Sequence, residues 1–119
     1  MGPTMASARF QFFTRRPATV EWRLISANNW ELGRSAVPAA TLEACLMVVL
    51  DLRATIDGFT DEVVADPRGG CRWRLLRDGT PIAVSSRSFP RRVECEATLA
   101  QFRKRAAGAP APPQLRIFR

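Results

Sequence analysis

The sequence contains no histidine and no tyrosine, and it has only three cysteines in 119 residues. Without histidine, neither a Ser-His nor a Cys-His catalytic pair can form, and the commonest metal ligand is missing. The cysteines, Cys45, Cys71 and Cys95, are odd in number and lack C-x-x-C spacing. That pattern argues against a disulfide framework and favours a reducing compartment. We therefore expect no metal, no cofactor and no enzymatic activity.

Long hydrophobic runs are also missing. The longest, from Ala44 to Leu50, is far short of the ~20 residues that span a bilayer. The N-terminus lacks the basic segment and apolar run of a secretory signal. These absences predict a cytoplasmic protein without a membrane partner. At 119 residues and 46% hydrophobic, the chain has the size of one domain and can bury enough surface to fold without disulfides.

Acidic residues are few, so the net charge is +7, and all but one of the 18 basic residues are arginine. The excess lies in the second half: residues 60–119 carry a net charge of +6, against +1 for residues 1–59. Such a bias can mark a nucleic-acid partner or an anionic ligand. The arginine-rich composition of a GC-rich coding sequence is the simpler explanation. The candidate anion-binding residues are Arg23, Arg72, Arg74, Arg87, Arg91 and Arg92.

What the sequence does have is an internal repeat. Trp-Arg-Leu occurs at 22–24 and again at 73–75, and Cys45 and Cys95 stand 50 residues apart. Each Trp-Arg-Leu is followed by a turn and a short apolar segment that ends in serine. A unit of about 50 residues buries too little surface to be stable alone. We therefore predict two units with one shared core, in which Trp22 and Trp73 are matching anchors.

Each unit is predicted to be β-β-β-α. Apolar residues alternate around both Trp-Arg-Leu segments, which indicates strands with one buried face, and Asp78-Gly79 favours a type I′ hairpin turn. After Pro38 and Pro90 the apolar spacing lengthens to three and four, which indicates helices over 39–56 and 91–106. The prediction is an α+β domain with an antiparallel sheet and two helices, made of a first unit (8–58), a second unit (59–107) and a Pro-rich tail (108–119) with one short strand.

The second unit carries a longer pattern: Trp-Arg-Leu at 73–75, Ser85-Ser86, Phe89 and Cys95-Glu96, in that order. This pattern resembles the YegP-like domain-of-unknown-function family. The first unit follows it less closely, with Ala39 in the place of Phe89. The resemblance covers roughly residues 8–106 and implies a tandem β-β-β-α repeat in an intertwined α+β fold. It also suggests a homodimer, and it brings no catalytic residue with it.

Four residues that could carry chemistry are better explained by structure. Cys45 and Cys95 fall on the apolar stripes of the two predicted helices, where a free cysteine packs as a small hydrophobe. Ser35 and Ser85 close strands, and as nucleophiles they would need a base, but the sequence has no histidine and Lys104 is its only lysine. Strand-end hydrogen bonds are the better interpretation for both serines.

The arginines offer the remaining candidate site. Arg23, Arg72 and Arg74 are predicted to point away from the tryptophan faces of their strands. Arg91-Arg92 opens the second helix, where the macrodipole disfavours cations. The pair therefore stands where helix electrostatics disfavours it, and such unfavourable placements often occur at functional sites.

The first predicted helix is apolar on nearly every side around Ala44–Leu50, so the second unit alone cannot cover it. A partner subunit or the C-terminal tail must supply the other cover. We expect a non-enzymatic structural or protein-interaction module that forms a homodimer. The alternative is a protein that binds nucleic acid or an anionic ligand through the Arg-rich surface of the second unit.

Overall fold

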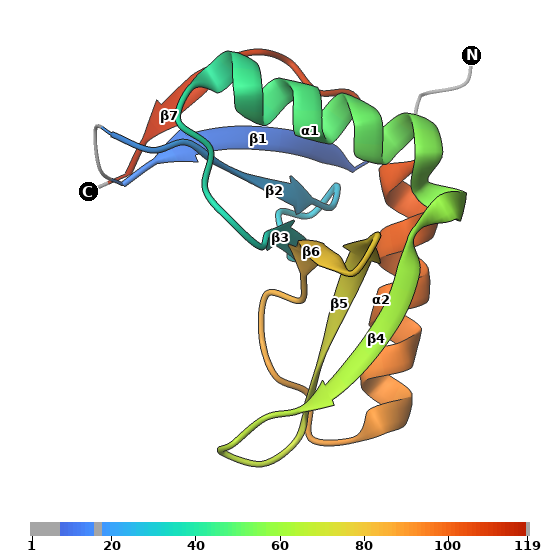
Figure 1. Ribbon diagram of the computed structural model, residues 1–119. Helices are drawn as coiled ribbons and strands as arrows, with labels where there is room; N and C mark the ends of the chain where they lie inside the picture. Colours follow the sequence, from blue (N-terminus) through green and yellow to red (C-terminus); the bar gives the residue numbers. More distant parts are fainter. Residues whose placement is uncertain (1–7, 16–17, 119) are drawn as a thin grey trace.

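The computed structural model describes residues 8–15 and 18–118 (Figure 1). The N-terminal segment 1–7 and the last arginine of the tail lie outside the described residues. The elements in chain order are β1 (Arg9–Thr14), β2 (Glu21–Ile25), β3 (Glu31–Ser35), α1 (Leu42–Thr55), a 3-10 turn (Ile56–Gly58), β4 (Thr60–Ala65), β5 (Cys71–Arg77), β6 (Thr80–Val84), α2 (Arg92–Ala106) and β7 (Leu115–Ile117).

The described strands form one sheet in the order β4-β5-β6-β3-β2-β1-β7. Every neighbouring pair is antiparallel except β1 and β7, which run parallel. The α+β class with two helices and a mostly antiparallel sheet is confirmed. The parallel edge arises because the tail returns alongside β1: the Phe10 amide donates to the Pro110 carbonyl at 2.9 Å, and the Phe118 amide donates to the Thr14 carbonyl at 2.9 Å.

The two halves of the sheet meet at β3 and β6. Only two residue pairs join these strands, Arg34 with Val84 and Ser35 with Ala83. A similar bridge precedes each helix: one joins Val20 and Ala39, and the other joins Cys71 and Phe89. The positions compared in the sequence, Ala39 and Phe89, thus make the same backbone contact to the strand region that carries the tryptophan.

One core lies between the sheet and the helices. Trp22 is 1% exposed and Trp73 is fully buried, and the prediction that both indoles lie in one interior is confirmed. Phe102 of α2 contacts both rings, with centroid distances of 6.3 Å to Trp22 and 4.9 Å to Trp73. The Phe102 side chain therefore packs against the central tryptophan of each half of the sheet.

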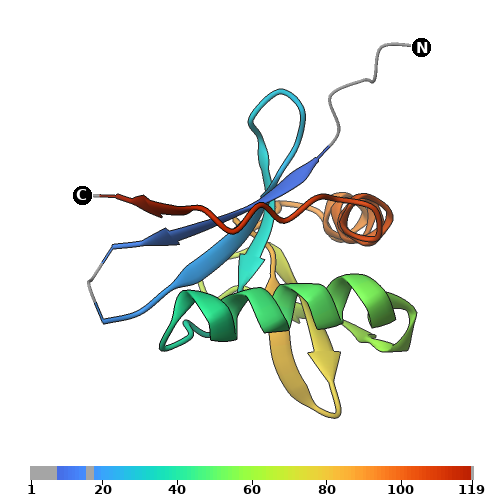
Figure 2. The ribbon, with the colours of Figure 1, turned by 90° about the horizontal axis from the view of Figure 1, so that it is seen from above.

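The two helices cover different strands. α1 packs on β1 and β2, whereas α2 packs on β3, β4 and β5. Figures 1 and 2 show the two helices crossing the sheet in different directions. No helix within the described ranges is long and apolar enough to cross a membrane.

Both helices begin later than their prolines suggest. Ala39 is held in its bridge to Val20, and α1 starts after Thr41, whose hydroxyl accepts a hydrogen bond from the Ala44 amide at 3.0 Å. This is the ordinary N-cap of a helix. The hairpin turn was placed correctly, because Asp78 and Gly79 both have positive φ, 50° and 82°, as a type I′ turn requires.

Candidate anion-binding surface

The face of the sheet opposite the helices carries a continuous row of paired side chains. Trp22, Leu24, Trp73 and Leu75 point into the core, so the alternate residues of β2 and β5 point to the other face. Strand register then aligns one residue from each of six strands. This cross-strand row consists of Glu62, Arg74, Val84, Arg34, Arg23 and Gln11.

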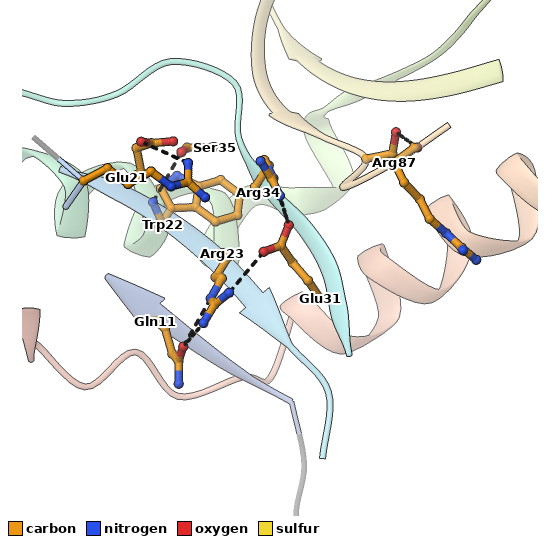
Figure 3. Close-up of polar contacts among 10 residues, drawn as sticks. Gln11, Glu21, Trp22, Arg23, Glu31, Arg34, Ser35 and Arg87 are labelled. Carbon is orange, nitrogen blue, oxygen red and sulfur yellow. Dashed lines mark hydrogen bonds and ion pairs between the residues drawn. The ribbon is translucent and has the colours of Figure 1, made fainter. Parts of the chain in front are cut away.

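Arg23 and Arg34 lie directly opposite each other in this row, and like charges in opposite positions destabilise a sheet. Glu31 relieves the repulsion. Its carboxylate lies 2.6 Å from Arg34 and 3.4 Å from Arg23. The Gln11 side-chain oxygen accepts a further hydrogen bond from Arg23 at 3.0 Å. Figure 3 shows these four side chains linked on one face of β1, β2 and β3.

The surroundings of Glu31 favour the ionised form of its carboxylate, which therefore carries a negative charge at neutral pH. Burial raises its pKa, but hydrogen bonding by Ser86 and the charges and hydrogen bonds of Arg34 and Arg23 outweigh burial and leave the pKa below its usual value. Arg23 and Arg34 are therefore engaged by a fixed negative charge. The sequence did not single out Arg34 or Glu31, because their proximity to Arg23 on the neighbouring strand follows from strand register.

Arg72 and Arg74 have carboxylate partners as well. Arg74 pairs with Glu62, with a 2.6 Å hydrogen bond from its Nε, and Arg72 Nε lies 3.0 Å from Asp66. The pKa of Asp66 is lowered to about 2 because its carboxylate accepts hydrogen bonds from the Ser88 hydroxyl, the Arg68 backbone amide and Arg72. Arg72, Arg74 and Arg68 line one hollow of about 520 Å³ that also contains Asp66.

Arg91 and Arg92 remain at the start of α2, as the sequence indicated. Glu94 lies 3.7 Å from Arg91, and Glu96 lies 3.0 Å from Arg92. Glu94 also accepts a hydrogen bond from the Arg91 amide at 3.3 Å, which is the acidic half of a capping box. Exposed pairs of this kind contribute about 0–1 kcal/mol each. Glu94 and Glu96 thus compensate the two positive charges that the dipole of α2 disfavours at its start.

Arg87 differs from the other five candidates, since no described carboxylate forms an ion pair with it. Its guanidinium carbon lies 5.0 Å from the centre of the Phe89 ring. The structure therefore does not gather the six candidate arginines into one uncompensated patch. Five are matched to acids within their own neighbourhood, and Arg87 alone keeps an unmatched positive charge.

Ser35 and Ser85 make the same contact in the two halves of the sheet. The Ser35 hydroxyl accepts a hydrogen bond from the Trp22 amide, and the Ser85 hydroxyl accepts one from the Trp73 amide, both at 3.3 Å. Strand-end hydrogen bonding, the interpretation favoured from the sequence, is confirmed. In the described parts of the chain, no group of three or more His, Cys, Asp or Glu side chains is arranged to hold a metal ion.

The cysteines are free thiols in different environments. Cys45 is 1% exposed, and burial, with a smaller contribution from the charge of Glu21, raises its pKa to about 12. Burial also raises the pKa of Cys95, which is fully buried. Cys71 is partly exposed.

This difference predicts selective thiol chemistry. Because the thiolate is the reactive form, we expect Ellman's reagent at about pH 8 to modify Cys71 at least tenfold faster than Cys45 or Cys95. The rates are read from absorbance in native buffer and in urea. A Cys71→Ser variant should lose only the fast phase. A single phase for all three thiols of the folded protein would contradict the assignment.

Comparison with known proteins identifies the fold of this chain but no activity. No protein-family model matches the sequence, and no curated protein matches it either. Two solved structures are similar. One is a protein of unknown function, YegP from E. coli, with a TM-score of 0.71, 14% identity, and 99% of each chain covered. The other is a UPF0339 protein from Shewanella oneidensis, with a TM-score of 0.66, 8% identity, and 88% of this chain and 89% of that chain covered.

The similarity to both structures extends over most of each chain, and the identities are low. The chain therefore has the YegP-like fold, as the resemblance of its second unit indicated.

Proposed function

We propose that this chain is a non-enzymatic protein-interaction module, built from two related β-β-β-α units, that forms a homodimer through the outer face of α1. The observation that carries the proposal is the exposure of that face. Met47 is 68% exposed, Val48 37% and Leu50 40%. The inner face of α1 is already buried in the core through Cys45, Val49 and Leu52, so the outer residues are not needed for folding.

The second helix shows that the fold does not require such a face. At the same 50-residue offset that relates Cys45 to Cys95, Met47 corresponds to Ala97 and Leu50 to Ala100. α2 thus has small side chains where α1 has large apolar ones. Grouped exposed apolar residues on a soluble protein usually mark a contact surface. The difference between the helices supports a contact specific to α1.

A second copy of the chain suits this face best. Glu43, Met47, Leu50 and Ala54 follow the i, i+4, i+7, i+11 spacing of one helix ridge. Two such ridges related by a two-fold axis perpendicular to the helix run antiparallel and are self-complementary. The antiparallel arrangement also opposes the two helix dipoles favourably.

The size of the ridge sets the strength of this contact. A 14-residue helix is about 21 Å long, and its outer face is smaller than the ~800 Å² per partner of a standard interface. We therefore expect a dimer with a dissociation constant in the micromolar range rather than an obligate one.

The duplicated-unit part of the proposal is supported by matched contacts. Trp22 and Trp73 each donate a backbone hydrogen bond to a serine hydroxyl, and a bridge precedes each helix at corresponding positions. The non-enzymatic part is supported by the chemistry of the polar groups. The buried thiols have raised pKa values, and the strand-end serines are bound to backbone groups, so neither provides an activated nucleophile.

The alternative, nucleic-acid binding through an Arg-rich surface, has less support. Five of its six arginines are paired with carboxylates, so phosphate contacts would have to displace those acids. The two rings beside Arg23 are not free to stack on bases either: Phe13 is only 1% exposed, and Phe118 is stacked on it at 5.0 Å, with the Arg23 guanidinium carbon 4.8 Å from the centre of its ring. Sheets that bind single strands normally stack bases on exposed rings.

Analytical ultracentrifugation tests the proposed dimer. We expect the protein at concentrations on the order of 100 µM to sediment at twice its monomer mass, and a Met47→Glu, Leu50→Glu double variant to sediment as a monomer, because the interface would bury two uncompensated carboxylates. The matched control is Ala97→Glu, Ala100→Glu on α2, which should remain dimeric. Far-UV circular dichroism establishes that each variant is folded. A wild-type monomer at every concentration, or equal dissociation of both variants, would overturn the proposal.

A further inference from the structure

A cavity of about 320 Å³ opens between the start of β3, the loop that joins β6 to α2, and the middle of α2. It is distinct from the outer face of α1, since none of its lining residues comes from that helix. The lining residues are Trp30, Glu31, Leu32, Ser86, Arg87, Phe89, Ala97, Thr98 and Gln101. We call it the Trp30 cavity. Its size lies at the lower end of the ~300–1,000 Å³ range of small-molecule sites.

The walls of the Trp30 cavity are apolar and aromatic. Leu32 and Phe89 are packed against the core, and Phe89 is 7% exposed. Trp30 stands at the mouth, 64% exposed. Its backbone is fixed in the turn between β2 and β3: the Trp30 amide donates to the Ser26 hydroxyl at 3.1 Å, and the Ser26 amide donates to the Trp30 carbonyl at 2.8 Å. The indole is thus an exposed ring on an anchored backbone, ready to stack on a flat group.

The charge at this cavity favours an anion. Arg87 is the candidate arginine that lacks a carboxylate partner, and stacking over Phe89 at 5.0 Å holds its planar guanidinium in place. Figure 3 shows Arg87 extending from its loop toward α2. Glu31 also lines the cavity, but its negative charge is matched by Arg34 at 2.6 Å and Arg23 at 3.4 Å. The positive charge of Arg87 therefore remains uncompensated.

Polar groups beside Arg87 can fix the orientation of a bound anion. Gln101 presents a side-chain amide donor to the cavity, whereas the single hydroxyl proton of Ser86 is directed to Glu31. The Thr98 hydroxyl already donates to the Cys95 carbonyl at 2.9 Å, so its oxygen is left as an acceptor. The combination of an aromatic mouth, an apolar wall and one cation with a neighbouring donor is typical of sites for flat organic anions.

We propose that the Trp30 cavity binds a small aromatic carboxylate, with the ring between Trp30 and Leu32 and the carboxylate on the Arg87 guanidinium. One or two fused rings fill the available volume. A ligand of this class takes its affinity from burial of the ring and its selectivity from the charge on Arg87.

Titration with 2-naphthoate, followed by two-dimensional amide and indole NMR, tests the site. We expect saturable shifts of the Trp30 indole signal and the Thr98 and Gln101 amides, with a dissociation constant below about 1 mM. The indole signals of the buried Trp22 and Trp73 should move little. The neutral analogue 2-naphthamide should bind at least tenfold more weakly, because it offers no charge to Arg87.

Two variants separate a specific site from general attraction to a basic protein. Arg87→Gln should weaken 2-naphthoate binding at least tenfold, whereas Arg105→Gln removes the same charge from the exposed end of α2 and should leave binding unchanged. Thermal unfolding shows that both variants are folded. The Met47→Glu, Leu50→Glu variant should bind as tightly as the wild type, so this test does not depend on the dimer. Absence of saturation, equal binding of the amide, or equal effects of the two arginine variants would overturn the proposal.

Discussion

Replacing Phe102 with alanine is expected to lower the free energy of unfolding by about 3–5 kcal/mol. Phe102 is fully buried, and its ring lies between the two indoles, 6.3 Å from Trp22 and 4.9 Å from Trp73. Truncation removes the ring contacts and leaves a cavity at the junction of the two halves of the sheet. A domain of this size has ~5–15 kcal/mol of stability in total, so the loss is a large fraction of it.

Urea unfolding followed by tryptophan fluorescence and by circular dichroism measures the effect of the Phe102 substitution. Val93→Ala is the matched control, because Val93 lies on the same helix and is 65% exposed. We expect that control to change stability by less than about 0.5 kcal/mol. A loss below about 1 kcal/mol for Phe102→Ala would mean that the ring does not hold the core together.

Gly33→Ala is expected to destabilise the protein by about 1–3 kcal/mol, although it adds only one methyl group. A Cβ at this position would lie 2.7 Å from two Phe102 ring carbons and 2.8 Å from the Trp73 ring. Gly33 is not among the glycines with positive φ, so the backbone accepts alanine and the cost is steric. β3 must lack a side chain here because α2 and β5 place two aromatic rings directly over it.

A double-mutant cycle separates this steric cause from a general loss of glycine. Combined with Phe102→Leu, the Gly33→Ala change should cost less than it does alone, because the smaller side chain makes room for the methyl group. Gly58→Ala is the control: no atom lies within 4 Å of its added Cβ, and we expect a change within about 0.5 kcal/mol. Chemical denaturation of the four proteins gives the coupling energy. Strict additivity, or an equal loss at Gly58, would contradict the steric account.

The elements of the fold were predictable because their signals are local. Alternation around Trp22 and Trp73 gave two strands, and the steps of three and four gave both helices. The positive-φ preference of Asp78-Gly79 gave the hairpin turn. The start of α1 was predicted at residue 39 but lies at Leu42, because Ala39 pairs with Val20, and a partner from another segment is not visible in the local sequence.

The candidate site was only partly predictable. Arg23, Arg72 and Arg74 could be assigned to the outer faces of strands from alternation alone. Whether they are neutralised depends on the register of neighbouring strands, which brings Glu31 to Arg23, Asp66 to Arg72 and Glu62 to Arg74. Whether Trp30 is exposed could not be decided from the sequence, since a tryptophan near a turn packs inward or outward according to what lies above it.

The sequence by itself determined that this chain is an α+β domain, that two tryptophans anchor its interior, and that one helix is too apolar to be covered by its own core alone. These properties follow from residue type and periodicity, which act over a few neighbouring positions. The tertiary structure alone decided the parallel return of β7 along β1, the close approach at Gly33, the pairing of five arginines with acids, and the cavity at Trp30. Each of these depends on which distant segments come into contact, and composition and spacing do not encode that directly.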